Sequence, residues 1–118
     1  MSVRPVRIYG DPVLRERARE VTSVDDTLRQ LIADMRETMH AYGGVGLAAN
    51  QVGVAQQLLV VDVPGEGEQR VRHALINPVV KRRAGSVSGE EGCLSVPGLW
   101  EDVTRAERLV VTGLDEEG

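Results

Sequence analysis

The pattern of hydrophobic and polar positions predicts one amphipathic helix early in the chain. Residues 23–26 (Ser-Val-Asp-Asp) indicate the helix start, because acidic residues in the first turn are favoured by the helix dipole. Gly43 and Gly44 indicate its end, because glycine tolerates the left-handed conformation found at helix C-termini. The apolar residues between these signals recur at helical spacing on one face. They are Leu28, Leu31, Ile32, Met35 and Met39.

Apolar runs after this helix predict β-strands. The predicted strands cover residues 57–63, 73–80, 84–90 and 100–112. The first is closed by Pro64-Gly65 and a charged turn. The second is expected to be interrupted at Pro78, because proline cannot donate a hydrogen bond to a neighbouring strand. The third is expected to lead into a loop that holds the single cysteine.

Both ends of the chain carry turn signals. Residues 7–15 are predicted to form a short extended segment that ends in a Gly-Asp-Pro turn. Residues 114–118 have the composition of a turn that introduces a partner strand, so we expect the last strand to lack its hairpin partner. These elements predict an α+β fold, in which the N-terminal helix packs on antiparallel or mixed β-sheets. We expect residues 1–118 to form a single, incomplete domain.

Composition narrows the class of protein. The chain has 118 residues, of which 42% are hydrophobic and 27% charged, values typical of a globular protein. A net charge of -4 argues against nucleic acid as the main ligand. The N-terminus lacks the apolar run of a signal peptide, and no segment approaches the roughly 20 apolar residues of a membrane span. One cysteine cannot form an internal disulfide, so we expect a soluble protein of the reducing cytoplasm.

Two stretches carry chemistry that ordinary folding does not require, residues 44–51 (Gly-Val-Gly-Leu-Ala-Ala-Asn-Gln) and residues 91–95 (Glu-Gly-Cys-Leu-Ser). In the first, glycines let the backbone approach a ligand closely, and the Gln51 amide can donate and accept hydrogen bonds. It is not a phosphate-binding loop, because no Gly-Lys-Ser/Thr follows. A helix end followed by a glycine-rich turn explains the first stretch as well.

Cys93 permits three hypotheses. A lone cysteine is commonly a small buried apolar residue, and the residues by themselves favour that interpretation. A nucleophilic cysteine would need a histidine base, and neither His40 nor His73 is marked as its partner by spacing. A thiolate metal ligand would need two or three further ligands.

The joint occurrence of the two stretches, in this order and about forty residues apart, resembles the peptide deformylases. These are metal hydrolases that remove the formyl group from nascent polypeptides. Residues 44–51 match the family motif Gly-x-Gly-x-Ala-Ala-x-Gln at every fixed position, and residues 91–95 match Glu-Gly-Cys-Leu-Ser without change. Shorter matches occur at residues 10–15, 76–78 and 105–107. The resemblance covers the whole chain and implies the deformylase fold.

The resemblance implies roles for residues of both motifs. Cys93 is expected to be the thiolate ligand of a metal, usually Fe²⁺ in this family and replaceable by Ni²⁺, Co²⁺ or Zn²⁺. Gln51 and the backbone N–H of Leu94 are expected to polarise the formyl oxygen and to hold the oxyanion. Glu91 and Arg105 are expected to form an ion pair that supports the segment carrying Cys93.

The resemblance also implies a substrate channel. The residues expected to line it are Gly44, Val45, Gly46 and Leu94. The backbone of Val45 and Gly46 is expected to pair with the substrate peptide as an added strand. Leu94 is expected to help wall the pocket for the methionine side chain.

The implied reaction is metal-assisted hydrolysis, in which a metal-activated water attacks the formyl carbon while a glutamate moves the proton. In the family, that glutamate and two histidine ligands lie in a third motif, His-Glu-x-x-His, on a C-terminal helix. This motif does not occur in the 118 residues. We therefore expect the C-terminal motif helix to be absent and the chain alone to hold no metal tightly and to be inactive. His40 and His73 do not match ligand positions.

Three hypotheses about function remain open. The chain is a deformylase truncated before the third motif, a non-catalytic paralogue that binds peptides or acts as a scaffold, or one half of a split or swapped enzyme. The expected partners are N-formylated nascent peptides, including those at the ribosome, with no direct nucleic-acid binding and no membrane binding. Self-association through exposed apolar surface is also expected.

Overall fold

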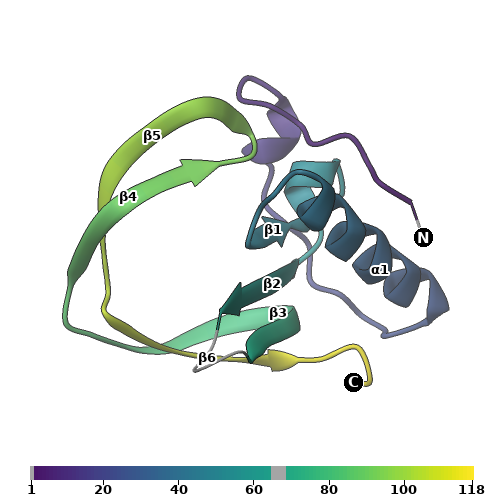
Figure 1. Cartoon of the computed structure of the whole chain (residues 1–118). Coiled ribbons are helices and arrows are strands. Elements are labelled where there is room, and N and C mark those ends of the chain that lie inside the picture. Colours follow the sequence, from purple (N-terminus) through teal and green to yellow (C-terminus); the bar gives the residue numbers. More distant parts are fainter. Residues whose placement is uncertain (1, 65–68) are drawn as a thin grey trace.

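The structure, a computed structural model, describes residues 2–64 and 69–118 and has the predicted α+β architecture. Its helical elements are η1 (Pro12–Leu14), α1 (Asp26–Ala41) and η2 (Ala49–Val52). Its strands are β1 (Gly46–Ala48), β2 (Leu58–Pro64), β3 (Arg70–Ala84), β4 (Val87–Cys93), β5 (Val96–Arg105) and β6 (Arg108–Leu114). Figure 1 shows α1 beside β1 and β2, while β4 and β5 arch away on the other side.

The amphipathic helix is confirmed, together with both of its end signals. Asp25 is the N-cap residue, and its side chain accepts the backbone N–H of Leu28 at 2.9 Å. At the other end Gly43 takes a φ of +70°, and the N–H of Gly44 donates to the carbonyl of Met39 at 2.9 Å. That hydrogen bond satisfies a carbonyl that has no partner within the helix, which is why the helix ends at two glycines.

The core lies between α1 and one face of the sheet that β1, β2 and β3 form. All five apolar helix residues predicted to share a face are buried. The core cluster consists of Leu28, Leu31, Ile32, Met35, Met39, Leu47, Ala49, Val52, Leu58, Val60, Ala74 and Ile76. Leu58 pairs with Ile76 and Val60 with Ala74, so the four side chains share the sheet face that meets α1.

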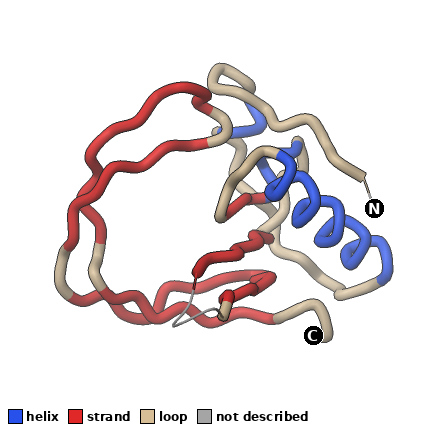
Figure 2. Tube along the Cα trace, viewed as in Figure 1, coloured by secondary structure: helices blue, strands red, loops and turns tan. Residues whose placement is uncertain are grey.

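The strands form two antiparallel sheets, which are coloured red in Figure 2. The larger has the order β1-β2-β3-β6, and the smaller is the two-stranded ribbon β4-β5. Within the described ranges, β4 and β5 pair only with each other. The ribbon therefore depends on other contacts to hold its far end in place.

β3 runs through Pro78, but its pairing with β6 is interrupted there, as predicted. Asn77 takes a φ of 54°, and the register with β6 shifts between Ile76 and Val79, which is a β-bulge. At a bulge the unpaired residue needs no ladder partner, so the missing proline N–H costs no hydrogen bond. The Asn77 side chain is also tied to Val21, with amide contacts of 2.8 and 2.9 Å to its backbone.

The single strand predicted over residues 100–112 is also wrong. The structure has two strands there, since β5 ends at Arg105 and β6 begins at Arg108. β5 pairs with β4, whereas β6 pairs with β3. A change of pairing partner leaves no mark in the apolar pattern. The turn predicted at Pro64-Gly65 extends into residues 65–68, which lie outside the described residues.

Asp62 is a buried carboxylate on the sheet face that meets α1, and three basic side chains, two arginines and a histidine, lie within hydrogen-bonding distance of it. His40 Nε2 lies 2.7 Å from Asp62 Oδ2, Arg70 Nε donates to Oδ1 at 2.7 Å, and Arg72 Nε donates to Oδ2 at 3.3 Å. The hydrogen bonds from Arg70 and His40 lower the pKa of the Asp62 carboxyl from its ordinary value of 3.8 to about 2. The cluster joins the end of α1 to β2 and β3.

We expect the Asp62 cluster to make the fold sensitive to acid. Because the pKa of Asp62 is lower in the folded state, its contribution to stability is present above pH 3.8 and is lost as pH falls toward about 2. Asp62→Asn should remove this part of the pH dependence and also destabilise the fold at neutral pH. Urea denaturation between pH 2 and pH 7 measures both effects, with Asp26→Asn as a control that removes a fully exposed carboxylate and should change the stability and its pH dependence much less. An unchanged pH profile in Asp62→Asn would contradict this prediction.

Large apolar side chains lie exposed on β3, β4, β5 and β6. They are Val71, Val79, Val80, Val87, Leu99, Trp100, Leu109, Val110 and Leu114. The last three belong to β6, which is an edge strand of the larger sheet. Exposed apolar edge strands promote association between chains.

We therefore expect the 118-residue chain to self-associate in a concentration-dependent way, measured by sedimentation velocity. Leu109→Lys should reduce association, because a lysine on an edge strand opposes strand pairing. Ile8→Lys is the matched control, since both side chains are 53% exposed but Ile8 lies outside the sheets. A chain that stays monomeric at every concentration would refute the prediction.

Candidate functional site

The structure brings the two motif stretches together. The first stretch becomes β1 and η2 rather than a simple loop, and the second becomes the end of β4 and the turn that follows it. Gly44 and Leu94 lie in contact, because a Cβ built on Gly44 would lie 2.8 Å from Leu94 Cδ1. Leu94 also packs against the core cluster. The absence of a side chain at residue 44 is therefore what lets the two stretches approach.

The Gln51 side chain bridges the two stretches in a defined orientation. Its Oε1 accepts the backbone N–H of Ala48 at 3.0 Å. Its Nε2 donates to Ser95 Oγ at 3.1 Å and lies 3.6 Å from Cys93 Sγ. Because only the carbonyl end can accept from Ala48, the amino end must face Cys93 and Ser95. The amide is thus held with its donors directed toward the sulfur.

Ser95 and Ala48 are the residues of this site that sequence reasoning missed. Ser95 is buried, at 4% exposed, and its hydroxyl is a partner of Gln51. The motif match included Ser95 but indicated no role for it. The Ala48 contribution comes from the backbone, so no side-chain pattern could have pointed to it.

Cys93 is exposed, so the hypothesis of a buried apolar cysteine is wrong. It lies at the end of β4, where the ribbon turns toward β5. The histidines lie elsewhere in the fold: His40 is bound to Asp62, and His73 lies on β3 opposite Val61. Residues 2–64 and 69–118 contain no group of three or more His, Cys, Asp or Glu side chains that could hold a metal ion. These residues therefore do not fit a complete metal site.

β1 offers an open backbone edge. It is the terminal strand of its sheet, and its inner edge pairs with β2. The N–H of Asp62 donates to the carbonyl of Val45 at 2.9 Å, while the N–H of Ala48 turns away from β2 to Gln51. In an antiparallel pair successive residues alternate in direction, so Gly46 directs its N–H and C=O outward. An extended peptide could pair there.

Glu91 and Arg105 form an ion pair across the β4-β5 ribbon. Arg105 Nε lies 2.9 and 2.8 Å from the two carboxylate oxygens of Glu91, so one nitrogen contacts both oxygens and no two-nitrogen fork forms. The hydrogen bond from Arg105 lowers the pKa of the Glu91 carboxyl, and the same bond raises the pKa of Arg105. The pair ties together the two strands that flank the Cys93 turn.

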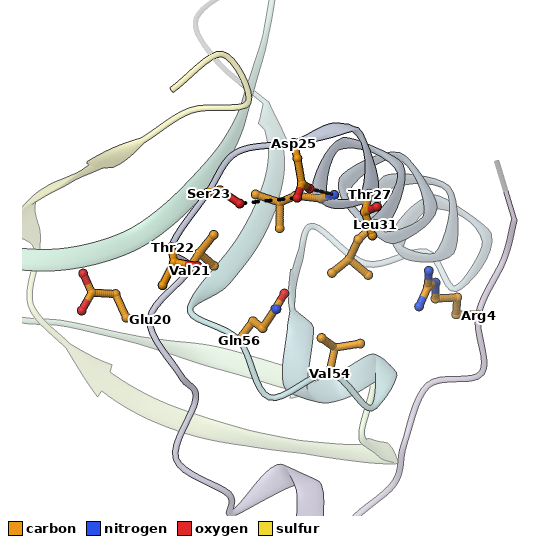
Figure 3. Close-up of a pocket in the computed structure, with 11 residues that line it drawn as sticks. Arg4, Glu20, Val21, Thr22, Ser23, Asp25, Thr27, Leu31, Val54 and Gln56 are labelled. Carbon is orange, nitrogen blue, oxygen red and sulfur yellow. Dashed lines mark hydrogen bonds between the residues drawn. The ribbon is translucent and has the colours of Figure 1, made fainter.

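Two pockets lie in different parts of the fold. One of about 220 Å³ adjoins Cys93 and is bordered by Val96, Leu99 and the Glu91–Arg105 pair. A larger one of about 440 Å³ lies between residues 20–28 and residues 54–56, as Figure 3 shows. The larger pocket contains none of the motif side chains, so we place the candidate site at the smaller one.

We expect Gly44→Ala to destabilise the contact between the two stretches. The new Cβ would overlap Leu94, which must move, at a cost of about 1–3 kcal/mol in the free energy of unfolding. Gly44→Ala combined with Leu94→Ala should show coupling between the two sites in a double-mutant cycle.

Gly89→Ala is the control for this prediction, because a Cβ at residue 89 meets nothing within 4 Å. Chemical denaturation measures all four variants. Equal effects of Gly44→Ala and Gly89→Ala would show that the close approach at residue 44 is unimportant.

No helix among the described residues is long and apolar enough to cross a membrane.

Several known proteins similar to this chain are peptide deformylases. The sequence model for polypeptide deformylase matches residues 3–118. Peptide deformylase from Alkalilimnicola ehrlichii is 49% identical over 118 residues, which cover 100% of this chain and 66% of that protein. Peptide deformylase 2 from Corynebacterium efficiens is 47% identical over 125 residues, which cover 100% of this chain and 65% of that protein. The chain thus spans just under two thirds of the length of these relatives.

Solved structures of peptide deformylases have the same fold as this chain. The crystal structure of peptide deformylase from Ehrlichia chaffeensis in complex with actinonin superposes with a TM-score of 0.95 at 41% identity, covering 100% of this chain and 72% of that one. The crystal structure of the peptide deformylase from Thermus thermophilus superposes with a TM-score of 0.88 at 49% identity, covering 98% of this chain and 67% of that one. On the site geometry, the family match and these relatives, the chain belongs to the polypeptide deformylase family.

Proposed function

We propose that these 118 residues supply the oxyanion- and peptide-binding part of a peptide deformylase, an enzyme that hydrolyses the N-formyl group of formyl-methionine at the start of nascent polypeptides. One observation carries the proposal. The Gln51 amide is held between Ala48 and Ser95 with its donors facing Cys93, inside two stretches that match the family motifs. An amide in that place is suited to a carbonyl oxygen that gains negative charge.

Gln51 and the Leu94 backbone are the proposed donors to the oxyanion. Gln51 Nε2 has two hydrogens, of which one is held by the Ser95 hydroxyl at 3.1 Å. The other faces Cys93 Sγ at the longer distance of 3.6 Å, so a formyl oxygen beside the sulfur could take its place. Leu94 follows Cys93 directly, so its N–H belongs to the same turn.

The proposed peptide site runs along β1. The outward N–H and C=O of Gly46 would form main-chain hydrogen bonds with the substrate, as an added strand does. Val45 lies at the start of this edge and is exposed, while Leu94 would provide an apolar wall for the methionine side chain. Gly44 leaves room for Leu94.

Polypeptide deformylases are metalloenzymes, and Cys93 is the proposed thiolate ligand in this chain. Its exposure suits a ligand better than a packing residue. One thiolate cannot hold a catalytic metal, so the remaining ligands would come from residues outside this sequence. We propose Fe²⁺, replaceable by Zn²⁺, Ni²⁺ or Co²⁺, for the complete site and no tightly bound metal for the 118 residues alone. The Glu91–Arg105 pair would support the Cys93 turn.

The proposed partners follow from the substrate. N-formylated peptides arise during translation, so we propose that the protein acts in the cytoplasm on nascent chains, including those still at the ribosome.

A chimera tests the proposed function. It joins residues 1–118 to the third of the Thermus thermophilus deformylase that lies beyond its match to this chain. We expect the chimera to bind metal and to release formate from formyl-Met-Ala-Ser, whereas residues 1–118 alone do neither. Cys93→Ala should abolish metal binding. Gln51→Leu should lower kcat by about 10²–10³-fold, because it removes an oxyanion donor.

The control for Gln51→Leu is Gln56→Leu, which alters a glutamine remote from the motif side chains and should keep normal turnover. A chimera that folds and binds metal but releases no formate would refute the proposal that residues 1–118 supply part of a catalytic site. If that chimera still binds the peptide, the chain is a peptide-binding module. Stoichiometric metal and turnover in residues 1–118 alone would refute the need for outside ligands.

A further inference from the structure

The N-terminal segment, residues 2–9, contacts both halves of the candidate site, although no motif assigns it a role. Figure 1 shows it running past α1 toward the end of the β4-β5 ribbon. Its backbone forms hydrogen bonds with α1, with η2 and with the turn after β4. We call residues 2–9 the strap.

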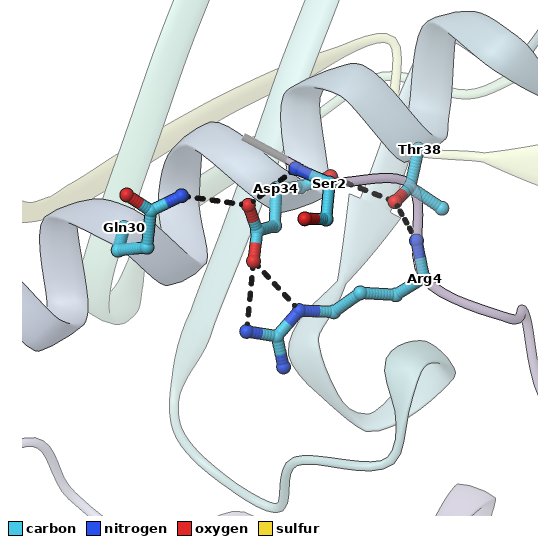
Figure 4. A network of polar contacts seen from close by, with 5 residues as sticks. All are labelled: Ser2, Arg4, Gln30, Asp34 and Thr38. Carbon is cyan, nitrogen blue, oxygen red and sulfur yellow. Dashed lines mark hydrogen bonds and ion pairs between the residues drawn. The ribbon is translucent and has the colours of Figure 1, made fainter.

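One end of the strap is anchored on α1 by Asp34, as Figure 4 shows. Asp34 is 5% exposed, and one of its oxygens accepts the N–H of Ser2 at 2.9 Å and the side-chain amide of Gln30 at 2.8 Å. The other oxygen accepts both Nε and Nη2 of Arg4, at 3.0 and 2.9 Å. Thr38, which is fully buried, accepts the N–H of Arg4 at 2.8 Å. A buried carboxylate with this many donors holds the strap at a defined place on the helix.

The other end of the strap binds the two site stretches. The N–H of Arg7 donates to the carbonyl of Gln51 at 2.7 Å, and the N–H of Tyr9 donates to the carbonyl of Ser95 at 2.8 Å. Residues two apart in an extended segment point to the same side, so one edge of the strap reaches both carbonyls. These carbonyls belong to the two residues whose side chains meet, at 3.1 Å between Gln51 Nε2 and Ser95 Oγ.

The strap and these two residues therefore form a closed ring of hydrogen bonds. Gln51 lies on η2, which belongs to the α1 side of the fold, whereas Ser95 lies in the turn that joins β4 to β5. Within the described residues the ribbon pairs with no strand of the larger sheet. The strap is a backbone link that sets the separation of the two halves, and the Gln51 side chain spans the same separation.

We propose that the strap positions the Gln51 amide, and that Asp34 and Arg4 are positioning residues that act on the site through it. The expected effect on the reaction rate rests on the proposed function, whereas the expected effect on the orientation of the Gln51 amide does not. Freeing the strap leaves the weaker side-chain contacts to hold the ribbon, so the amide loses its defined orientation toward Cys93. The rate of a reaction that depends on placed donors then falls.

Amide hydrogen exchange in the 118-residue chain tests the structural step. The N–H groups of Arg7 and Tyr9 report the strap, and the N–H of Ala48 reports the Gln51 side chain, because Gln51 Oε1 is its acceptor. In Arg4→Gln we expect all three to exchange about tenfold faster or more. Gln51→Leu gives the reference rate of hydrogen exchange at the Ala48 N–H when its acceptor has been removed.

Arg36→Gln is the matched control. Arg36, on α1, pairs with the carboxylate of Glu116 at 2.8 Å, and its side chain is 33% exposed against 36% for Arg4. Loss of this pair should leave the exchange rate of the Ala48 N–H unchanged. If Arg4→Gln unfolds the chain, Thr38→Val, which removes the acceptor for the Arg4 N–H, is compared with Thr38→Ser, which keeps it. Thr38→Val should accelerate exchange at the Ala48 N–H, whereas Thr38→Ser should exchange at the wild-type rate.

Kinetics in the chimera test the catalytic step. Arg4→Gln should lower kcat by about tenfold and change KM by less than about twofold, because it disturbs the donor geometry and not the peptide edge. The proposal is overturned if Ala48 exchange stays at the wild-type rate while the strap amides accelerate, or if Arg36→Gln has the same effects as Arg4→Gln. An inactive chimera refutes the proposed function, whereas the exchange result stands independently of turnover.

Discussion

The structure depends on the attachment of the β4-β5 ribbon to the α1 side of the fold. In the described part of the chain the ribbon's strands pair only with each other, so its far end is held by a few contacts. Gln51 reaches Ser95 and Cys93, the strap backbone reaches Ser95, and Leu94 packs against Gly44 and the core. All of these contacts lie within the two motif stretches or join the strap to them. The chemistry of the site and the joining of the two halves therefore use the same atoms.

Two buried carboxylates on the core side of the fold extend this arrangement. Asp34 on α1 binds Arg4 of the strap, and Asp62 on β2 binds His40 at the end of α1 together with Arg70 and Arg72. The backbone of Asp62 also holds the carbonyl of Val45 beside the open edge of β1. Each carboxylate offsets its loss of hydration with several hydrogen bonds, at least two of them from arginine nitrogens, which is the condition for burying a charge without destabilising the fold. Contacts with α1 therefore help to position both the open edge of β1 and, through the strap, the Gln51 amide.

Local elements could be predicted from the sequence, whereas pairing could not. The helix and its glycine end follow from apolar spacing and backbone preferences, which act within a few residues, and both are confirmed. β2 lies where an apolar run predicted a strand. The prediction of one strand over residues 100–112 failed, because the chain changes pairing partner there. That change depends on residues distant in the sequence.

The sequence by itself determined the family and the types of group in the site, because the motif residues match at each fixed position and their chemistry is carried by side-chain type. Only the tertiary structure decided that Cys93 is exposed, that Gln51 is oriented by Ala48 and Ser95, and that the strap reaches both stretches. The reason is physical. Residue type is a local property of the chain, whereas the direction of an amide is set by backbone groups that folding brings together from distant positions.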